Sequence, residues 1–190
     1  MLPLNGNCVL RKINMVGKFL YFAYGSNLLE QRIHINNPTA VRHGIGKLQD
    51  YQLDFVTYSK IWKGASATIV PKKDSHVWGA LWEIDMVDME HLDNQEGVSH
   101  KIYFPLTVEV ETPIGKKLNC RVYIQTAKVP DVVPLEDLPP ERKPSAVYIN
   151  TMLKGAKESG LPGEYQEFLG RVAHNGYNGE IDIGTQLNLK

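Results

Sequence analysis

The 190-residue sequence has very little cysteine and no excess of charge of either sign. Its two cysteines, Cys8 and Cys120, are too few for a disulfide scaffold or a four-cysteine zinc site, and they favour a reducing compartment. Lys plus Arg and Asp plus Glu both number 21, so the chain lacks the long-range field expected of a protein that binds nucleic acid or an anionic membrane. We therefore expect no nucleic-acid or membrane partner, and any ligand must be recognised by local contacts.

Long apolar runs and the common cofactor motifs are also missing. No apolar stretch approaches the roughly 18 residues of a membrane-spanning helix, and the first residues lack the apolar core of a secretory signal. We therefore expect a soluble, cytoplasmic protein. The sequence contains no GxxxxGKS/T loop, no GxGxxG after a strand and no HExxH, and its six histidines match the spacing of no single metal site. We expect neither a metal nor a cofactor.

The composition that remains is that of one ordinary globular domain. Hydrophobic residues make up 43% of the chain and charged residues 22%, which argues against disorder. The length is enough for one sizeable core. Residues 1–17 show turn formers and no sustained periodicity, and the last residues are polar and glycine-rich. We expect a flexible tail over 1–17, a folded domain over 18–175 and a second tail over 176–190.

The first half of this domain shows a strand, a tight turn and a helix, followed by more strands. The run Phe19–Tyr24 is rich in aromatics that favour a strand, and it stops at Gly25. Asn27 followed three residues later by Glu30 is typical of a capping box, which predicts a helix carried by Leu28, Leu29, Arg32 and Ile33. The further predicted strands are Tyr51–Tyr58, Ala65–Val70, Val77–Ile84, Ile102–Glu111 and Leu118–Gln125.

The second half contains one predicted hairpin and several helices. The turn Thr112–Gly115 predicts antiparallel pairing of the last two strands. Between Ile84 and Ile102 we predict a short helix that Asp85 caps and Gly97 ends. Prolines from Pro130 to Pro144 predict a long surface connection, and the helices expected after it are Ser145–Ser159 and Glu164–Gly170.

Two segments have residue types that suit chemistry. Tyr24–Asn27 joins a strand to a helix N-terminus, where free backbone N–H groups favour an anion and Gly25 lets a ligand approach the backbone. A plain helix cap with a turn glycine explains the same residues. Glu96 ends a helix on which Glu90 and Asp93 precede it at spacings of three, so negative charge gathers at the negative end of the helix dipole.

Crowding and burial would both raise the pKa of the Glu96 carboxyl, which is the direction that a general base near neutral pH requires. Three solvated acids on a surface helix also explain the pattern, and both interpretations stay open. Tyr103, seven residues further on, starts a strand and could reach the same cleft, although a tyrosine in a strand is usually a packing residue.

Three segments together resemble the gamma-glutamylcyclotransferase family. They are Phe19–Asn27, Leu92–Val98 with the residues Gln95-Glu96-Gly97-Val98, and Gly155–Pro162 followed by Glu164-Tyr165-Gln166. The resemblance runs from about Lys18 to about Arg171. It implies an α+β fold with a small mixed β-barrel flanked by helices, and no cofactor.

The resemblance also implies an enzyme that converts gamma-glutamyl amino acids to 5-oxoproline and the free amino acid, an intramolecular amide cleavage of lyase or acyltransferase type. Carried over by position, Tyr24, Gly25, Ser26 and Asn27 match the substrate-cradling loop, Glu96 the catalytic acid-base and Tyr103 a tyrosine near the substrate. The family suggests a homodimer. Two alternatives remain: a related cyclotransferase specific for glutathione or gamma-glutamyl-lysine, and a non-catalytic small-molecule binder of the same fold.

Overall fold

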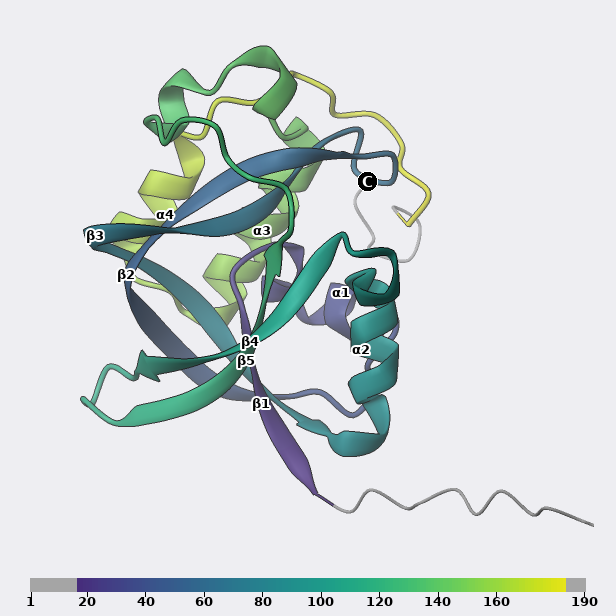
Figure 1. Ribbon diagram of the computed structural model, residues 1–190, viewed down its shortest axis with the longest axis vertical. Helices are drawn as coiled ribbons and strands as arrows, with labels where there is room; N and C mark the ends of the chain where they lie inside the picture. The colour runs from purple at the N-terminus through teal and green to yellow at the C-terminus, as the bar shows by residue number, and fades with distance from the viewer. Residues whose placement is uncertain (1–16, 184–190) are drawn as a thin grey trace, which may run out of the picture.

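Five strands close into a barrel in the part of the chain that the computed structural model describes, residues 17–183 (Figure 1). The strands are β1 Lys18–Ala23, β2 Val41–Ser59, β3 Gly64–Asp85, β4 Tyr103–Glu111 and β5 Lys117–Gln125. Their order around the barrel is β1-β3-β2-β4-β5; β1 and β5 pair in parallel and the other pairs are antiparallel. This is the mixed barrel with flanking helices that the family resemblance implied, and the fold prediction is confirmed.

The hairpin of β2 and β3 is much longer than the sequence pattern predicted. β2 begins at Val41 rather than Tyr51, and the predicted strands Ala65–Val70 and Val77–Ile84 are two parts of β3. The polar stretch between them does not end the strand, because it bends together with its partner at a register shift between Gln49 and Tyr51. Asp50 and Asp74 take positive φ values there, and the Asp74 N–H donates to Asp50 Oδ1 at 3.0 Å. Turn-forming residues thus produce a bulge inside a continuous ladder.

The segment after β1 corrects the predicted capping box. Ser26–Leu28 form the short 3-10 turn η1, and α1 spans only Glu30–His34, with Leu29 at its N-cap position and no side-chain cap. The Asn27 side chain instead donates to groups on other elements. A tertiary network therefore replaces the local cap that the spacing suggested.

The helix between β3 and β4 agrees with its predicted end. The 3-10 turn η2 Met86–Asp88 leads into α2 Met89–Gln95, and Gly97 ends the helix with a φ of 64°, a left-handed value that favours glycine. Asp85 stands at the N-cap position of η2 but makes no side-chain cap bond. The 3-10 turn η3 Val98–His100 completes the path to β4.

The turn Thr112–Gly115 joins β4 to β5 in the predicted antiparallel pair. The proline-rich connection that follows contains the 3-10 turns η4 Leu135–Asp137 and η5 Pro140–Arg142. A buried ion pair between Arg142 and Asp54 of β2 anchors it, and Arg142 Nε also donates to the Phe55 carbonyl at 3.1 Å. The connection is therefore bound to the barrel by its one inward-facing cation.

The last helices are α3 Ala146–Ser159 and α4 Gly163–Gly170, close to the predicted ranges. The two pack against each other, and in Figure 1 they lie to the left of α1 and α2. α3 also packs on η1: a Cβ at Gly155 would lie 2.3 Å from the backbone nitrogen of Leu29. Only a residue without a side chain lets α3 approach this closely.

The predicted domain boundaries remain a prediction, because residues 1–16, with Cys8, and 184–190 lie outside the described part. Within residues 176–183 the chain keeps contact with the domain: the Val147 N–H donates to the Tyr177 carbonyl at 3.1 Å, and Ile181 is buried. Cys120 is a buried free thiol. No helix in residues 17–183 is long and apolar enough to cross a membrane.

Candidate active site

A cavity of about 340 Å³ opens between the segment after β1, the end of α2 and the β2–β3 turn. All six site residues predicted from the sequence line it: Tyr24, Gly25, Ser26, Asn27, Glu96 and Tyr103. We call the set Tyr24–Asn27, Arg32, Glu96, Tyr103 and Tyr148 the floor of the cavity. The rim consists of Tyr58–Ile61 and Ile102. Side chains from distant parts of the chain thus meet at one hollow.

Gly25 of the floor has little room for a side chain, because the Tyr148 hydroxyl lies close to its backbone. A Cβ at Gly25 would be 3.1 Å from Tyr148 Oη and 3.5 Å from the Ala67 Cβ. The φ of Gly25 is −107°, which side-chain-bearing residues also adopt, so a left-handed turn is not what requires glycine here. A side chain at this position would project against Tyr148 and into the cavity.

Asn27 is hydrogen-bonded through its side chain and backbone to β1, to β3 and to the end of α2. Its Nδ2 donates to Tyr21 Oη at 3.1 Å and to Glu96 Oε1 at 3.2 Å. Gln95 Nε2 in turn donates to Asn27 Oδ1 at 3.1 Å, and Trp82 Nε1 donates to the Asn27 carbonyl at 2.9 Å. Asn27 therefore holds the carboxylate of Glu96 from the loop side.

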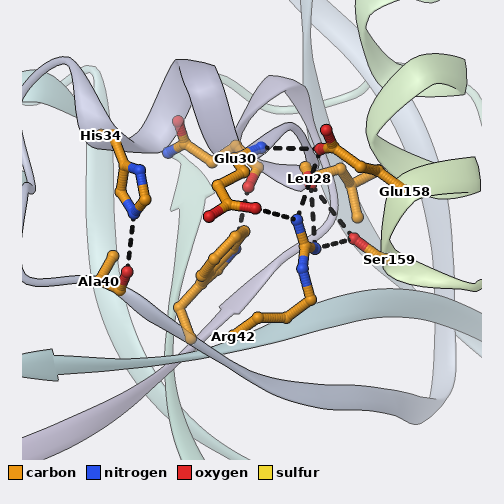
Figure 2. Close-up of polar contacts among 9 residues, drawn as sticks. Leu28, Glu30, His34, Ala40, Arg42, Glu158 and Ser159 are labelled. Atoms are coloured by element: carbon orange, nitrogen blue, oxygen red, sulfur yellow. Dashed lines mark hydrogen bonds and ion pairs between the residues drawn. The ribbon is translucent and has the colours of Figure 1, made fainter.

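Arg42 of β2 supports the loop after β1 through the contacts drawn in Figure 2. Its guanidinium donates to Ser159 Oγ and, at 3.5 Å, to the Leu28 carbonyl, and it lies 3.4 Å from a carboxylate oxygen of Glu158. The guanidinium carbon also stands 4.3 Å from the centre of the Trp82 ring. Arg42 thus ties the loop after β1 to the barrel and to the end of α3.

Glu96 is the C-cap residue of α2, and its carboxyl faces the cavity. Burial raises the pKa of Glu96 to about 7, against the lowering effects of the Arg32 charge and of hydrogen bonds from Gln95 and Asn27. The shift has the direction that the sequence pattern indicated. Its main cause is desolvation, however, and the charge of Asp93 is the smallest of the named contributions.

The predicted crowding of acids along α2 therefore needs correction. Glu90 is exposed to solvent, and Asp93 forms an ion pair with Arg121 at 2.6 Å while accepting a hydrogen bond from Tyr123. Each step of three residues along a helix changes the direction of the side chain, so the first and the last of these acids point to different sides. Each acid therefore has a different environment. Only Glu96 reaches the cavity.

The hydroxyl groups of Tyr24 and Tyr103 are both bound within the protein. Tyr24 Oη donates to the Tyr123 carbonyl at 2.5 Å, and Tyr103 Oη donates to the Ala67 carbonyl at 2.7 Å. Tyr103 Oη also accepts from Gln125 Nε2 at 3.0 Å. These two tyrosines contribute ring surface to the cavity, and their hydroxyls fix the rings in place.

Sequence reasoning missed two floor residues, Arg32 and Tyr148. Arg32 was expected only to carry the helix, yet a cation between Leu28, Leu29 and Ile33 on an apolar face was a signal that it points inward. Its Nε and Nη1 are buried without a partner in residues 17–183. The Tyr148 hydroxyl accepts a hydrogen bond from the Ala67 N–H at 3.2 Å, and burial raises the pKa of Tyr148 to about 12. Nothing local to α3 distinguishes Tyr148 from a core residue.

The floor and its surroundings can therefore perform proton transfer near neutral pH next to a fixed cation. No group of three His, Cys, Asp or Glu in the described residues is placed to hold a metal ion. A ligand with both an ammonium and a carboxylate would match the paired charges of Glu96 and Arg32.

The chain is similar in sequence to proteins of known family. The pattern of the AIG2-like family matches residues 76–169. The gamma-glutamylcyclotransferases of Bos taurus and Homo sapiens are 42% and 41% identical to the chain over 167 residues, which is 86% of this chain and 83% of each relative. The chain belongs to the gamma-glutamylcyclotransferase family.

A solved gamma-glutamyl cyclotransferase structure agrees with this assignment. It superposes on the chain with a TM-score of 0.81 at 37% identity, and the match covers 91% of this chain and 98% of that one. The resemblance drawn from the three sequence segments is thereby confirmed.

Proposed function

We propose that this member of the gamma-glutamylcyclotransferase family converts gamma-glutamyl amino acids to 5-oxoproline and the free amino acid, a reaction of the lyase or acyltransferase type in glutathione metabolism. The observation that carries the proposal is the Glu96 carboxyl, whose pKa is raised to about 7 in the wall of a cavity that also presents the Tyr24–Asn27 loop. A solvated surface acid would not have this pKa.

In this reaction the substrate's own α-amino group attacks its γ-carbonyl and closes a five-membered ring. The nucleophile is intramolecular, so the protein need not supply one. Glu96 accepts the proton that the α-ammonium loses, and then donates it to the departing amine. The C–N bond of the lactam forms, the γ-amide bond breaks, and no redox step occurs.

The raised pKa makes Glu96 a competent base for this proton. An ordinary Glu lies about 3.5 pKa units below an α-ammonium of about 7.8, which corresponds to roughly 5 kcal/mol. With the pKa of Glu96 at about 7, the gap falls to roughly one unit, or about 1 kcal/mol. Burial in the cavity thus lowers the cost of proton transfer.

The floor also offers donors for the oxyanion that develops at the γ-carbonyl. The candidates are the backbone N–H groups of Gly25 and Asn27 and the Tyr148 hydroxyl, all from residues that line the cavity. Because the oxygen of Tyr148 accepts the Ala67 N–H, its own proton can be donated to an oxygen in the cavity. One such donor contributes about 3 kcal/mol in other enzymes.

The test is mass spectrometry for 5-oxoproline after incubation with gamma-glutamyl-alanine, its α-glutamyl isomer, glutathione and gamma-glutamyl-lysine. We expect 5-oxoproline from gamma-glutamyl-alanine and none from the α-glutamyl isomer, whose amine cannot close the same ring. Reaction with glutathione alone, or with gamma-glutamyl-lysine alone, would assign the chain to one of the narrower cyclotransferases. Free glutamate in place of 5-oxoproline would mean hydrolysis, and no product at all would favour a non-catalytic binder.

The proposal also includes a cellular location and an oligomeric state. A cytoplasmic location agrees with the chain's two cysteines, of which Cys120 is a buried free thiol. A homodimer is suggested by the family and would have apolar surface to use on β4, where Phe104 and Leu106 are exposed. Cell fractionation and analytical ultracentrifugation test the two statements, and a monomer at all concentrations would contradict the second.

A further inference from the structure

Arg32 is a buried cation that forms no ion pair with any group in residues 17–183. The residue is 8% exposed, and its Nε and Nη1 are buried without a hydrogen-bond partner in residues 17–183. It nevertheless lines the cavity, together with Glu96. Buried ions in proteins are usually paired. An unpaired guanidinium at the wall of a cavity therefore indicates that an anionic ligand binds there.

Glu96 is not that anion. The ion pairs of the described residues do not include one between Arg32 and Glu96. Glu96 instead receives the amide of Asn27 at 3.2 Å, while the charge of Arg32 acts on it from further away. Arg32 and Glu96 thus line one cavity without forming an ion pair. A ligand with both an anionic and a cationic group would suit this arrangement, with its anion at Arg32 and its cation at Glu96.

We propose that Arg32 binds the α-carboxylate of the gamma-glutamyl group, an inference that rests on the proposed function. A guanidinium brings a full positive charge to a carboxylate, whereas a backbone N–H group is an uncharged donor. With Arg32 on the carboxylate, the α-ammonium of the same carbon lies toward Glu96, the group that must accept its proton. The residue thereby positions the nucleophile and selects gamma-glutamyl compounds with a free α-carboxylate.

This assignment also divides the remaining donors of the floor. The α-carboxylate is unchanged in 5-oxoproline, whereas the ammonium becomes the lactam nitrogen. Arg32 therefore holds substrate and product alike. The N–H groups of Gly25 and Asn27 and the Tyr148 hydroxyl are left for the oxyanion. Product binding should accordingly depend on Arg32 and be insensitive to Glu96→Gln.

The experiment compares two substrates with two enzymes. The substrates are gamma-glutamyl-alanine and its analogue in which the glutamyl α-carboxylate is a carboxamide, which can still cyclise. For Arg32→Met we expect kcat/KM to fall about 10- to 100-fold with the carboxylate substrate, since a hydrogen bond to a charged group is lost, and less than about threefold with the carboxamide. Equal losses on both substrates would overturn the inference. Arg171→Met, at an exposed arginine, is the matched control and should change neither.

The fold of the variant supplies an independent measurement. Removing an unpaired buried charge should leave the melting temperature of Arg32→Met equal to or above that of the parent. If Arg32→Met does not fold, Arg32→Gln decides, because it removes the charge but keeps a polar side chain. We expect this variant to lose selectivity for the carboxylate substrate, and parent-like selectivity would contradict the inference.

A direct binding measurement separates this inference from the proposed function. If the parent makes no 5-oxoproline, the proposed function is wrong, but calorimetric titration with 5-oxoproline and with its carboxamide still tests Arg32. Tighter binding of the carboxylate by the parent, lost in Arg32→Met, supports a carboxylate site. Equal binding of both compounds by the parent would contradict it, whatever the turnover.

Discussion

The floor of the cavity and its rim differ in how the protein holds them. The floor side chains of Tyr24, Asn27 and Tyr148 are buried and bound by hydrogen bonds to the barrel and to each other. At the rim, Tyr58, Ile61 and Ile102 are between 43% and 59% exposed. A hydrogen-bonded polar floor discriminates strictly, because a missing partner leaves a buried group unpaired, whereas an exposed rim tolerates variation.

This contrast assigns the two halves of a gamma-glutamyl substrate to the two regions. The half with an ammonium, a carboxylate and a carbonyl matches the floor, and the leaving amino acid, with its variable side chain, matches the rim. Each prediction below changes one region and asks whether the other responds.

The largest expected effect follows from Glu96→Gln. The amide keeps the shape and the hydrogen bond with Asn27 but accepts no proton, so we expect kcat to fall about 10²- to 10⁴-fold with substrate binding retained. Glu90→Gln, on the same helix but exposed to solvent, serves as the control and should be unaffected. Turnover by Glu96→Gln within about threefold of the parent would remove Glu96 as the base.

The same substitution should stabilise the protein at high pH. Because burial raises the pKa of Glu96 from 4.5 to about 7, the folded state binds more protons between these values, and stability falls as pH rises through that window. Glu96→Gln should therefore be more stable than the parent by up to about 3 kcal/mol above pH 8, and nearly equal at pH 4.

Urea unfolding at the two pH values measures this difference, and a constant difference would contradict it. The activity of the parent should fall as pH drops below about 7, because a protonated Glu96 is no base. A pH profile of kcat/KM that is flat between pH 5 and pH 8 would speak against the assignment.

Gly155→Ala tests whether the floor depends on close packing from outside the cavity. The new Cβ would lie 2.3 Å from the Leu29 nitrogen, so the loop or α3 must shift. We expect a loss of about 1 to 3 kcal/mol in stability and a reduced kcat/KM. Gly170→Ala in α4, where nothing lies within 4 Å, is the matched control. If both variants kept parent-like activity and stability, the loop would be less tightly held than we infer.

The smallest effect is expected at the rim. Ile61→Ala removes exposed apolar surface and should change kcat/KM by less than about tenfold, with the change depending on the leaving amino acid. A panel of gamma-glutamyl amino acids measured with parent and variant shows this dependence. A loss as large as that of Glu96→Gln would place the rim among the groups that hold the reacting atoms.

The family resemblance selected the six candidate site residues, and two of their segments also have residue types that are unusual for their position. Tyr24–Asn27 interrupts an aromatic strand, and Glu96 is an acid at the helix end that disfavours acids. The shape of the β2–β3 hairpin was not predictable, since turn-forming residues such as Asp50 and Asp74 lie in a bulge whose strands continue on both sides. Turn-forming residues in a sequence do not distinguish a bulge within a strand from the end of that strand.

The sequence by itself determined the strand, loop and helix pattern around Tyr24–Asn27, the end of α2 at Gly97, the α3 helix and the family. Tertiary structure alone decided which groups surround Asn27, and it placed Arg32 and Tyr148 at the cavity. It also separated the acids of α2, so that of Glu90, Asp93 and Glu96 only Glu96 lines the cavity. The physical reason is that turns and helix ends depend on neighbours in sequence, whereas desolvation and the pairing of a charge depend on groups that the barrel brings together from 30 to more than 100 residues away.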